Sequence, residues 1–386
     1  LHIFREKGTD MSEILNGPAG RIARLRTLMA ERGYDAVVVR DEANLRWLTG
    51  AMRVFDYTGE YPHVAFVTAD ECFLHTDSRY FNSFEENMPA GSPWKLDMDE
   101  IDMPRWVAEH ARSTKSRVVA VEDDMHINFF RGIERGLEDC SICASLPLMH
   151  GDLQLMRAIK DAEEIELMRH AQSITDAAFA HMCEFIRPGY TEKQLRTELE
   201  TFMFDHGADD LAFGSIVASG PNTANPHAIS SDRVVEKGDF VLMDYGAGYR
   251  DYKSDMTRTV CVGEPSEKQR EIYDIVRRTH EECVAAIHAG VDGHDIHLLS
   301  KKIIGDAGYG EYYGHGLGHG VGIDIHELPV FGRKSNIVEE GAVITVEPGI
   351  YLPGVGGVRL EDYGVVTKDG YEPFTTSTHE LVVIDC

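Results

Sequence analysis

Residues 314–327 read Gly-His-Gly-Leu-Gly-His-Gly-Val-Gly-Ile-Asp-Ile-His-Glu. Three histidines, His315, His319 and His326, fall within twelve residues on a backbone rich in glycine. Glycine at this density disfavours a helix and indicates an extended or looping segment that other groups can approach closely. Imidazole is a common metal ligand and proton carrier. The stretch therefore predicts part of a metal-binding or catalytic site whose other members lie elsewhere in the chain.

Composition limits the classes of partner. The chain has 386 residues, enough for two or three domains, and a formal net charge of −27. So acidic a surface repels phosphate, which argues against a nucleic-acid partner and against an anionic membrane. No apolar run is long enough to span a bilayer, and residues 1–20 lack the apolar core of a secretory signal. Seven scattered cysteines indicate reduced thiols, so we expect a cytoplasmic protein.

Residues 11–150 are expected to form an α/β domain, with residues 1–10 as an extension ahead of it. Residues 20–32 carry apolar side chains at helical spacing, and Gly33 follows as a helix stop. A further helix is expected at 105–112, and short apolar runs predict strands at 35–40, 63–68, 71–76 and 117–122. Alternating strands and helices are typical of an α/β domain. This domain offers no catalytic constellation.

Residues 151–386 are expected to form an α+β domain with an internal repeat. The segments 235–246 and 338–349 align without a gap at an offset of 103 residues, and Asp244 falls on Glu347. Helix-start patterns lie at Asp161, Thr191 and Ser266. We therefore expect two helices and a hairpin in each half, with the halves related by a pseudo-two-fold axis.

The acidic residues of this repeat predict a cluster of carboxylates. If the chain turns back at residues 249–250, Asp244 lies directly opposite Asp255, and such pairs have Cβ atoms about 5 Å apart. Glu347 and Glu361 flank the corresponding hairpin of the second half. Opposed carboxylates repel each other, so the arrangement requires a cation or a shared proton.

Four converging carboxylates and one imidazole form a hard, oxygen-rich ligand set. Two divalent ions about 3.5–4 Å apart can share such carboxylates, whereas one ion would leave several negative charges unneutralised. The ligand type favours manganese first, with cobalt, iron or zinc as the other candidates. We therefore expect two divalent metal ions per chain.

The motifs together resemble the creatinase, aminopeptidase P and proline dipeptidase family of metallopeptidases, which have the pita-bread fold. The segments that carry the resemblance are Met243-Asp-Tyr-Gly246, Ser254-Asp-Met-Thr-Arg-Thr259, the histidine stretch, Val346-Glu-Pro-Gly349 and Val358-Arg-Leu-Glu-Asp362. Residues 44–50 also resemble the N-terminal domain of that family, more weakly. The resemblance implies a pita-bread catalytic domain after the α/β domain. It also implies that the metal ligands are Asp244, Asp255, His319, Glu347 and Glu361.

The resemblance assigns roles at the reacting bond as well. His227 matches the family histidine that contacts the scissile region, and His315 and His326 match the other two active-site histidines. The ions would convert a bridging water into hydroxide for attack on the carbonyl, and Glu347 would pass the proton to the leaving nitrogen. His227 and His326 would hold the tetrahedral intermediate. The reaction that this implies is hydrolysis of the bond before proline in a small peptide, by a homodimer.

Two features of the site stay open. Some proline dipeptidases of this family have an arginine directly after the His-Glu-x-Pro segment, which clamps the carboxylate of the substrate. Here Val330 takes that position and Arg333 lies three residues further on, so a dipeptidase and an aminopeptidase for longer peptides are both consistent with the sequence. Arg359 is suited to orient Glu361, to bind a substrate carboxylate or to form an ordinary salt bridge.

Two other classes of function fit the same scaffold. A different hydrolase or a lyase would act on a small betaine-like or guanidino substrate, since a fold does not fix the chemistry. A non-catalytic binding module would have lost metal ligands, and none of the five is missing from this sequence. The intact ligand set favours the peptidase.

Overall fold

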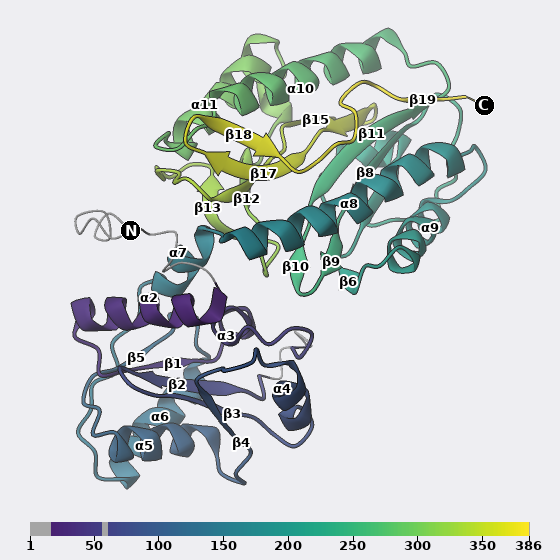
Figure 1. Ribbon diagram of the computed structural model, residues 1–386. Helices are drawn as coiled ribbons and strands as arrows, with labels where there is room; N and C mark the ends of the chain where they lie inside the picture. The colour runs from purple at the N-terminus through teal and green to yellow at the C-terminus, as the bar shows by residue number, and fades with distance from the viewer. Residues whose placement is uncertain (1–16, 56–60, 386) are drawn as a thin grey trace. The chain divides into compact units, whose positions relative to one another are not determined.

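The computed structural model describes residues 17–55 and 61–385, so residues 1–10 and the start of the domain expected at residue 11 lie outside the described part (Figure 1). The chain folds as two compact units that meet in sequence between Met156 and Arg157. This point falls within helix α7 (Asp152–Ala158). The domain bounds expected from the sequence, 11–150 and 151–386, stay a prediction.

The N-terminal unit is an α/β fold around a mixed sheet with the strand order β4-β3-β2-β1-β5. Its elements are α2 (Gly17–Arg32), β1 (Ala36–Val39), α3 (Glu42–Thr49), β2 (Val64–Thr68), β3 (Cys72–His75), α4 (Phe81–Asn87), β4 (Trp94–Asp97), α5 (Met103–Ser113), β5 (Val119–Val121) and α6 (Ile127–Asp139). Figure 1 shows α2 on one side of this sheet and α5 with α6 on the other. Both faces of the sheet are thus covered, which is why β1, β2 and β5 are buried along their whole length.

The elements expected in this unit are confirmed. Helix α2 buries Ile22, Leu25 and Met29 at helical spacing, and Gly33 follows it with a φ of +71°. That left-handed conformation ends a helix readily because glycine has no Cβ. The two strands expected at 63–68 and 71–76 pair antiparallel as β2 and β3.

The second unit contains the repeat. Its first half comprises α8 (Ala162–Phe185), α9 (Glu192–Asp205), β6 (Asp210–Leu211), β7 (Ile216–Ser219), η2 (Gly220–Ala224), β8 (Phe240–Tyr245), β9 (Ala247–Tyr249), β10 (Tyr252–Lys253) and β11 (Met256–Val262). Its second half comprises α10 (Glu267–Ala286), α11 (Gly293–Asp306), η3 (Gly310–Tyr312), β12 (Gly318–Gly320), β13 (Glu327–Phe331), β14 (Val343–Val346), β15 (Gly349–Leu352), β16 (Gly356–Arg359), β17 (Asp362–Thr367), β18 (Gly370–Pro373) and β19 (Val383–Ile384). Each half therefore consists of two helices followed by strands that end in a long, broken hairpin.

Equivalent contacts support the internal repeat. All three predicted helix starts, Asp161, Thr191 and Ser266, form complete capping boxes. The N-cap of the second helix in each half also forms an isolated bridge, Thr191 with Val234 and Asp292 with Ile337. Two such bridges at matching places are not expected from chance similarity of apolar strands, and they agree with two halves of common design.

Each helix pair covers its own strands. In the first half, Ile174 of α8 and Leu195 of α9 pack in one core with Met243 of β8. In the second half, Cys283 of α10 and Ile296 of α11 pack in a separate core that also holds Ile344 and Val346 of β14. Figure 1 shows the two helix pairs on the outer sides of this unit, with the strands between them. The inner faces of the strands are therefore left to carry polar side chains.

The register predicted for the first hairpin is wrong by two residues. The turn residues are Arg250 and Asp251, with φ values of 48° and 71°, and Asp244 pairs with Thr257 rather than with Asp255. Two successive positive φ values are typical of the two-residue type I′ turn, whose twist matches the twist of the two strands in a β-hairpin. A shift of two residues keeps every side chain on its original face, so Asp255 stays on the face of Asp244.

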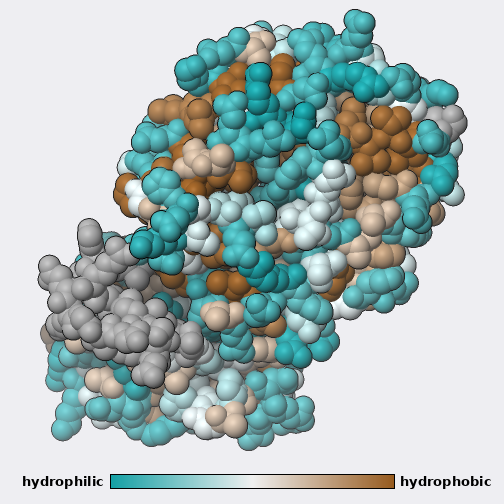
Figure 2. Space-filling view, turned by 45° about the horizontal axis from the view of Figure 1, so that its top comes forward, coloured by the Kyte–Doolittle hydropathy of each residue, from teal (hydrophilic) through white to brown (hydrophobic). Residues whose placement is uncertain are grey.

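Figure 2 shows a mainly hydrophilic face interrupted by separate hydrophobic patches. Among residues 17–55 and 61–385, no helix combines the length and the hydropathy that crossing a bilayer requires.

Candidate metal centre

The predicted metal ligands lie where the two long hairpins break. Asp244 is near the end of β8, and Asp255 lies between β10 and β11. Glu347 lies between β14 and β15, and Glu361 between β16 and β17. At the first break the chains approach so closely that a Cβ on Gly246 would lie 1.9 Å from the Ser254 carbonyl oxygen. Only glycine fits at this close approach of two backbones.

The structure brings the five predicted ligands together. Single ligand atoms of Asp255, His319 and Glu361 all lie within 4.8 Å of one another. The Nε2 atom of His319 is 3.7 Å from Oδ2 of Asp255 and 3.5 Å from Oε1 of Glu347. Asp244 adjoins this group, since its charge raises the pKa of both Asp255 and Glu347.

Two further side chains hold acidic residues of the site in place by hydrogen bonds. Arg359, which is buried, donates from Nη2 to Asp244 at 2.5 Å and from Nε to the Thr257 hydroxyl at 2.9 Å. The Thr257 hydroxyl in turn donates to Oε2 of Glu361 at 2.6 Å. The sequence left several roles open for Arg359. The structure shows that it forms a salt bridge, and the acid in this salt bridge is Asp244. The chain Asp244–Arg359–Thr257–Glu361 therefore joins the two halves of the repeat.

The charge of the site is not balanced by protein groups. Burial and the charges of Asp244 and Glu347 raise the pKa of Asp255 well above its usual value. Burial and the charges of Asp255, Glu347 and Asp244 raise the pKa of Glu361 well above its usual value, and burial raises that of Glu347 to about 8. Within the described residues, Oδ1 of Asp244 is buried without a hydrogen-bond partner. Buried acids with raised pKa values and a bare oxygen fit a site that holds cations.

The histidines of the glycine-rich stretch differ in position. Burial lowers the pKa of His319 to about 4, so the ring is neutral at pH 7 and has a lone pair for a metal. His326 is exposed, and its ring packs edge-on against that of His319 with centroids 4.3 Å apart. His227 is exposed in the turn after η2, and partial burial together with the nearby His227 lowers the pKa of His326. His227 and His326 thus lie near each other on the open side of the site.

His315 belongs to a hydrogen-bonded network that the sequence did not reveal. Its Nε2 atom lies 2.9 Å from the hydroxyl of Tyr351, which also accepts a hydrogen bond from Nη1 of Arg359 at 2.9 Å. Arg359 further donates to the carbonyl oxygen of Pro226, next to His227. Tyr351 and Arg359 therefore hold His315 and the His227 loop around the carboxylates. Nothing in the spacing of Tyr351 distinguishes it from an ordinary strand residue.

A buried ion triad anchors the end of the histidine stretch. Glu327 follows His326 and contacts Arg157 through one carboxylate oxygen and Lys160 through the other, the latter at 2.9 Å. Burial alone would raise the pKa of Glu327, but these two cations more than offset it and lower the pKa to about 2. A buried carboxylate with two bound cations stays ionised, so the triad fixes the backbone that carries His326.

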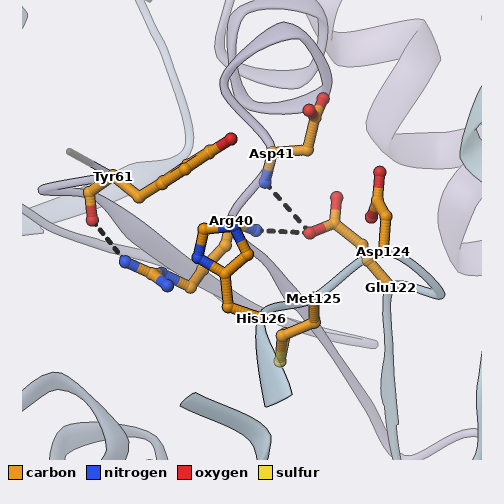
Figure 3. Close-up of a pocket in the computed structure, with 7 residues that line it drawn as sticks. All are labelled: Arg40, Asp41, Tyr61, Glu122, Asp124, Met125 and His126. Carbon is orange, nitrogen blue, oxygen red and sulfur yellow. Dashed lines mark hydrogen bonds between the residues drawn. The ribbon is translucent and has the colours of Figure 1, made fainter. Parts of the chain in front are cut away.

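The N-terminal unit has a separate polar pocket (Figure 3). Its lining residues are Arg40, Asp41, Tyr61, Glu122, Asp124, Met125 and His126. Figure 3 shows the Glu122 carboxylate at the backbone N–H groups of Arg40 and Asp41, at 2.7 Å and 3.0 Å. The side-chain amide of Asn44 donates to its other oxygen at 2.8 Å. Asn44 in α3 thus binds Glu122, the residue directly after β5, which gives Asn44 a structural role.

Without metal, the stability of the protein should fall as pH rises from 6.5 to 8. The carboxyls of Asp255, Glu347 and Glu361 have raised pKa values in the folded state. They bind more protons folded than unfolded in this range, so the free energy of unfolding decreases with pH. The lowered pKa values of buried histidines act in the opposite sense, but this effect fades as the pH rises above about 6.5, where the unfolded histidines lose their protons. Thermal unfolding of metal-free protein at pH 6.5 and 8 measures the fall.

The Glu347→Gln variant is the control for this prediction. It removes one of the three carboxyls and leaves every other titrating group in place, including Glu122, whose burial raises its pKa to about 8. We expect the fall in melting temperature to be smaller in the variant. An equal fall in both proteins would show that the metal centre is not its source.

The comparisons with known proteins agree with this geometry. The model described as "Creatinase/Prolidase N-terminal domain" matches residues 21–152. An "Xaa-Pro dipeptidase" of Pyrococcus furiosus is 43% identical over 367 residues, which cover 94% of this chain and 99% of the relative.

Two solved structures are similar over almost the whole chain. One is an Xaa-Pro dipeptidase from Bacillus anthracis, with a TM-score of 0.87 and 36% identity over 95% of this chain and all of the other. The second is an X-Pro aminopeptidase from Thermotoga maritima, with a TM-score of 0.82 and 32% identity over 92% of this chain and 99% of the other. The model described as "Metallopeptidase family M24" matches residues 166–368, more than half of the chain. The chain thus belongs to metallopeptidase family M24 and has its pita-bread fold.

Proposed function

We propose that this metallopeptidase hydrolyses the peptide bond before proline in small peptides, with two divalent metal ions as cofactors. The observation that carries the proposal is the convergence of Asp244, Asp255, Glu347 and Glu361 on the neutral ring of His319. Relatives named Xaa-Pro dipeptidase and X-Pro aminopeptidase over nearly the full chain support the choice of proline.

The ligand set supports two ions of a hard metal. Three of the acids have raised pKa values, and in the described part of the chain only Asp244 among the four has an arginine at hydrogen-bond distance. One divalent ion would leave negative charge uncompensated in a buried site, which is costly. Oxygen-dominated ligands favour manganese, with cobalt, zinc or iron as alternatives.

Each residue of the site can then be assigned a role in the reaction. Bound divalent ions supply Lewis acidity and lower the pKa of a water. Glu347, whose side chain is 19% exposed, is the carboxylate that we assign to pass a proton to the leaving nitrogen. His227 and His326 lie on the open side and would donate hydrogen bonds to the oxyanion. His315, held by Tyr351, would keep the scissile region in place.

The other two functions have less support. A hydrolase or lyase for a betaine-like or guanidino substrate needs groups chosen for that substrate, and the relatives that we compared carry peptidase names. A binding module without catalysis gives no reason for five ligands in one site. A cytoplasmic location fits the free thiols of Cys140 and Cys143. The homodimer stays a prediction.

Product analysis on Leu-Pro beside Leu-Pro-Pro tests the proposed function and sets the length of the substrate. Arg333 decides the outcome if it binds the free carboxylate of a dipeptide. It is exposed after β13, and burial together with the charge of Arg333 lowers the pKa of Lys301, so these two basic groups lie near each other. A charge-assisted hydrogen bond contributes about 1.5–3 kcal/mol, or about one to two decades in rate.

We therefore expect Arg333→Ala to slow Leu-Pro hydrolysis by about 10- to 100-fold and to leave Leu-Pro-Pro nearly unchanged. Lys334→Ala, at the neighbouring exposed position, is the matched control and should affect neither substrate. Equal losses on both peptides in Arg333→Ala would assign Arg333 to the support of the metal site. No effect on either peptide would make it an ordinary surface arginine.

A further inference from the structure

A second group of potential metal ligands lies in the catalytic unit, apart from the centre described above. It consists of His280 on α10, Asp362 at the start of β17, and His379 in the segment before β19. One ligand atom of each lies within 4.8 Å of the other two. The side chains of His280 and Asp362 are buried, at 2% and 3% exposure, and that of His379 is 32% exposed. The group is thus buried but can be reached from solvent at His379.

His280 is the unexplained member of this group. Within the described residues, neither of its ring nitrogens has a hydrogen-bond partner, although both are buried. Leaving a buried polar group unpaired costs about 1–3 kcal/mol. Its Nε2 atom faces Oδ2 of Asp362 at 3.6 Å, too far for a hydrogen bond. Burial lowers the pKa of His280 to about 4, so the ring is neutral at pH 7 and offers a lone pair.

The neighbouring arginine cannot supply the missing partner. Arg258 donates to Oδ1 of Asp362 at 2.6 Å, and its other four N–H groups are used by backbone carbonyl oxygens. Those carbonyls belong to Thr257, Glu361, Ser377 and Thr378. A guanidinium has five N–H donors in all, so none remains for His280. Arg258 orients the Asp362 carboxylate and leaves Oδ2 directed at the two histidines.

The spacing of the ligand atoms suits a tetrahedral ion. Zinc–ligand distances of about 2.0–2.2 Å place two ligands about 3.3 Å apart. The observed 3.6 Å between His280 Nε2 and Asp362 Oδ2 is close to this value. His379 Nε2 lies 2.7 Å from the same oxygen, so it would move outward by about half an ångström. The charge of Arg258 opposes a cation, but it sits on the other carboxylate oxygen and is itself surrounded by carbonyls.

We propose that His280, Asp362 and His379 bind one zinc-like transition-metal ion at a site separate from the catalytic centre. Two imidazoles and one carboxylate are a common zinc ligand set with a fourth position open to water. Successive residues of an extended chain point to opposite faces, so Asp362 is directed away from the site of Glu361. The ion would tie α10, β17 and the C-terminal segment together, beside the backbone that carries Glu361.

The test is the zinc content of metal-stripped protein after equilibrium dialysis against zinc. Wild-type protein is expected to bind one more zinc ion per chain than His379→Ala, and one more than His280→Gln. Glutamine can still hydrogen-bond to Asp362, so the second variant guards against loss of folding in the core. The matched control is His181→Ala, because His181 also lies 2.7 Å from a carboxylate, that of Glu198, and is 28% exposed. It should bind as much zinc as the wild type.

A second readout separates binding at the cluster from binding elsewhere. Zinc should raise the melting temperature of wild-type protein and of His181→Ala further than that of His379→Ala, since only an occupied cluster adds the extra stabilisation. Equal zinc content in wild type, His379→Ala and His280→Gln would overturn the proposal and leave His379 as an ordinary hydrogen-bond partner of Asp362. Because the comparison is a difference of one ion, it holds whether or not the catalytic centre works as proposed above.

Discussion

Replacing Asp255 with alanine is expected to abolish hydrolysis of Leu-Pro while the protein stays folded. Asp255 is buried, and its carboxylate lies in one group with His319 and Glu361. Loss of an outer-shell partner of a metal ligand already costs about 10- to 100-fold in activity or metal affinity. Loss of a ligand itself should therefore lower the rate by more than about 100-fold. Steady-state hydrolysis of Leu-Pro with manganese present measures it.

The fold should tolerate this change because Asp255 is not stabilising without metal. Burial and the like charges of Asp244 and Glu347 disfavour its ionised form. The metal-free variant is thus expected to melt at the same temperature as metal-free wild type or higher. Asp232→Ala, at an exposed salt bridge with Lys193, is the control and should keep full activity. Near-native turnover by Asp255→Ala would remove Asp255 from the metal centre.

The second large effect that we expect is a preference for Ala-Pro over Ala-Ala. The nitrogen of a bond before proline has no N–H, so a site shaped for it offers that nitrogen no acceptor. An ordinary dipeptide would bury its N–H unpaired, at a cost of about 1–3 kcal/mol. This corresponds to roughly 5- to 150-fold in kcat/KM.

Initial rates on the two dipeptides, at equal metal content, test this preference. They differ only in the second residue, so the free amino terminus and the carboxylate are matched between them. Comparable kcat/KM values would point to a general aminopeptidase or dipeptidase on the same metal centre. This result would be consistent with the proposed metal centre, but it would contradict the proposed preference for a bond before proline.

Local sequence signals predicted the helices and the residues that the structure brings together. The capping boxes at Asp161, Thr191 and Ser266 are each formed by residues three positions apart, so the sequence alone contains the whole interaction. The repeat of an acid at Asp244 and Glu347 likewise located the carboxylates. The family resemblance then selected the five ligands, and the structure places them together.

The hairpin register depended on information that the sequence does not display. Asn-Gly or Asp-Gly usually marks a two-residue turn with positive φ values. Here Arg250 and Asp251 adopt that turn, and neither is glycine or asparagine. The prediction placed the tip one residue too early, and the pairing moved by two. Because this even shift preserves the face of each side chain, the expectation of a carboxylate cluster survived the error.

Contacts between residues far apart in the sequence were the other feature that could not be predicted. Arg359 finds Asp244 115 residues away, and Glu327 finds Arg157 170 residues away. No periodicity or spacing links such positions, since they meet only when the chain folds. The same holds for His280 and Asp362, which come from a helix and a strand with no shared motif. Burial, and not sequence, distinguishes these residues from ordinary surface charges.

The most direct test of the account is a manganese titration of metal-stripped protein, followed by release of free proline from Leu-Pro. The account predicts no hydrolysis without metal and a rate that reaches its plateau at two manganese ions per chain, since one ion cannot balance the acids around His319. Full activity at a metal content near zero would contradict it. So would fully loaded protein that releases no proline.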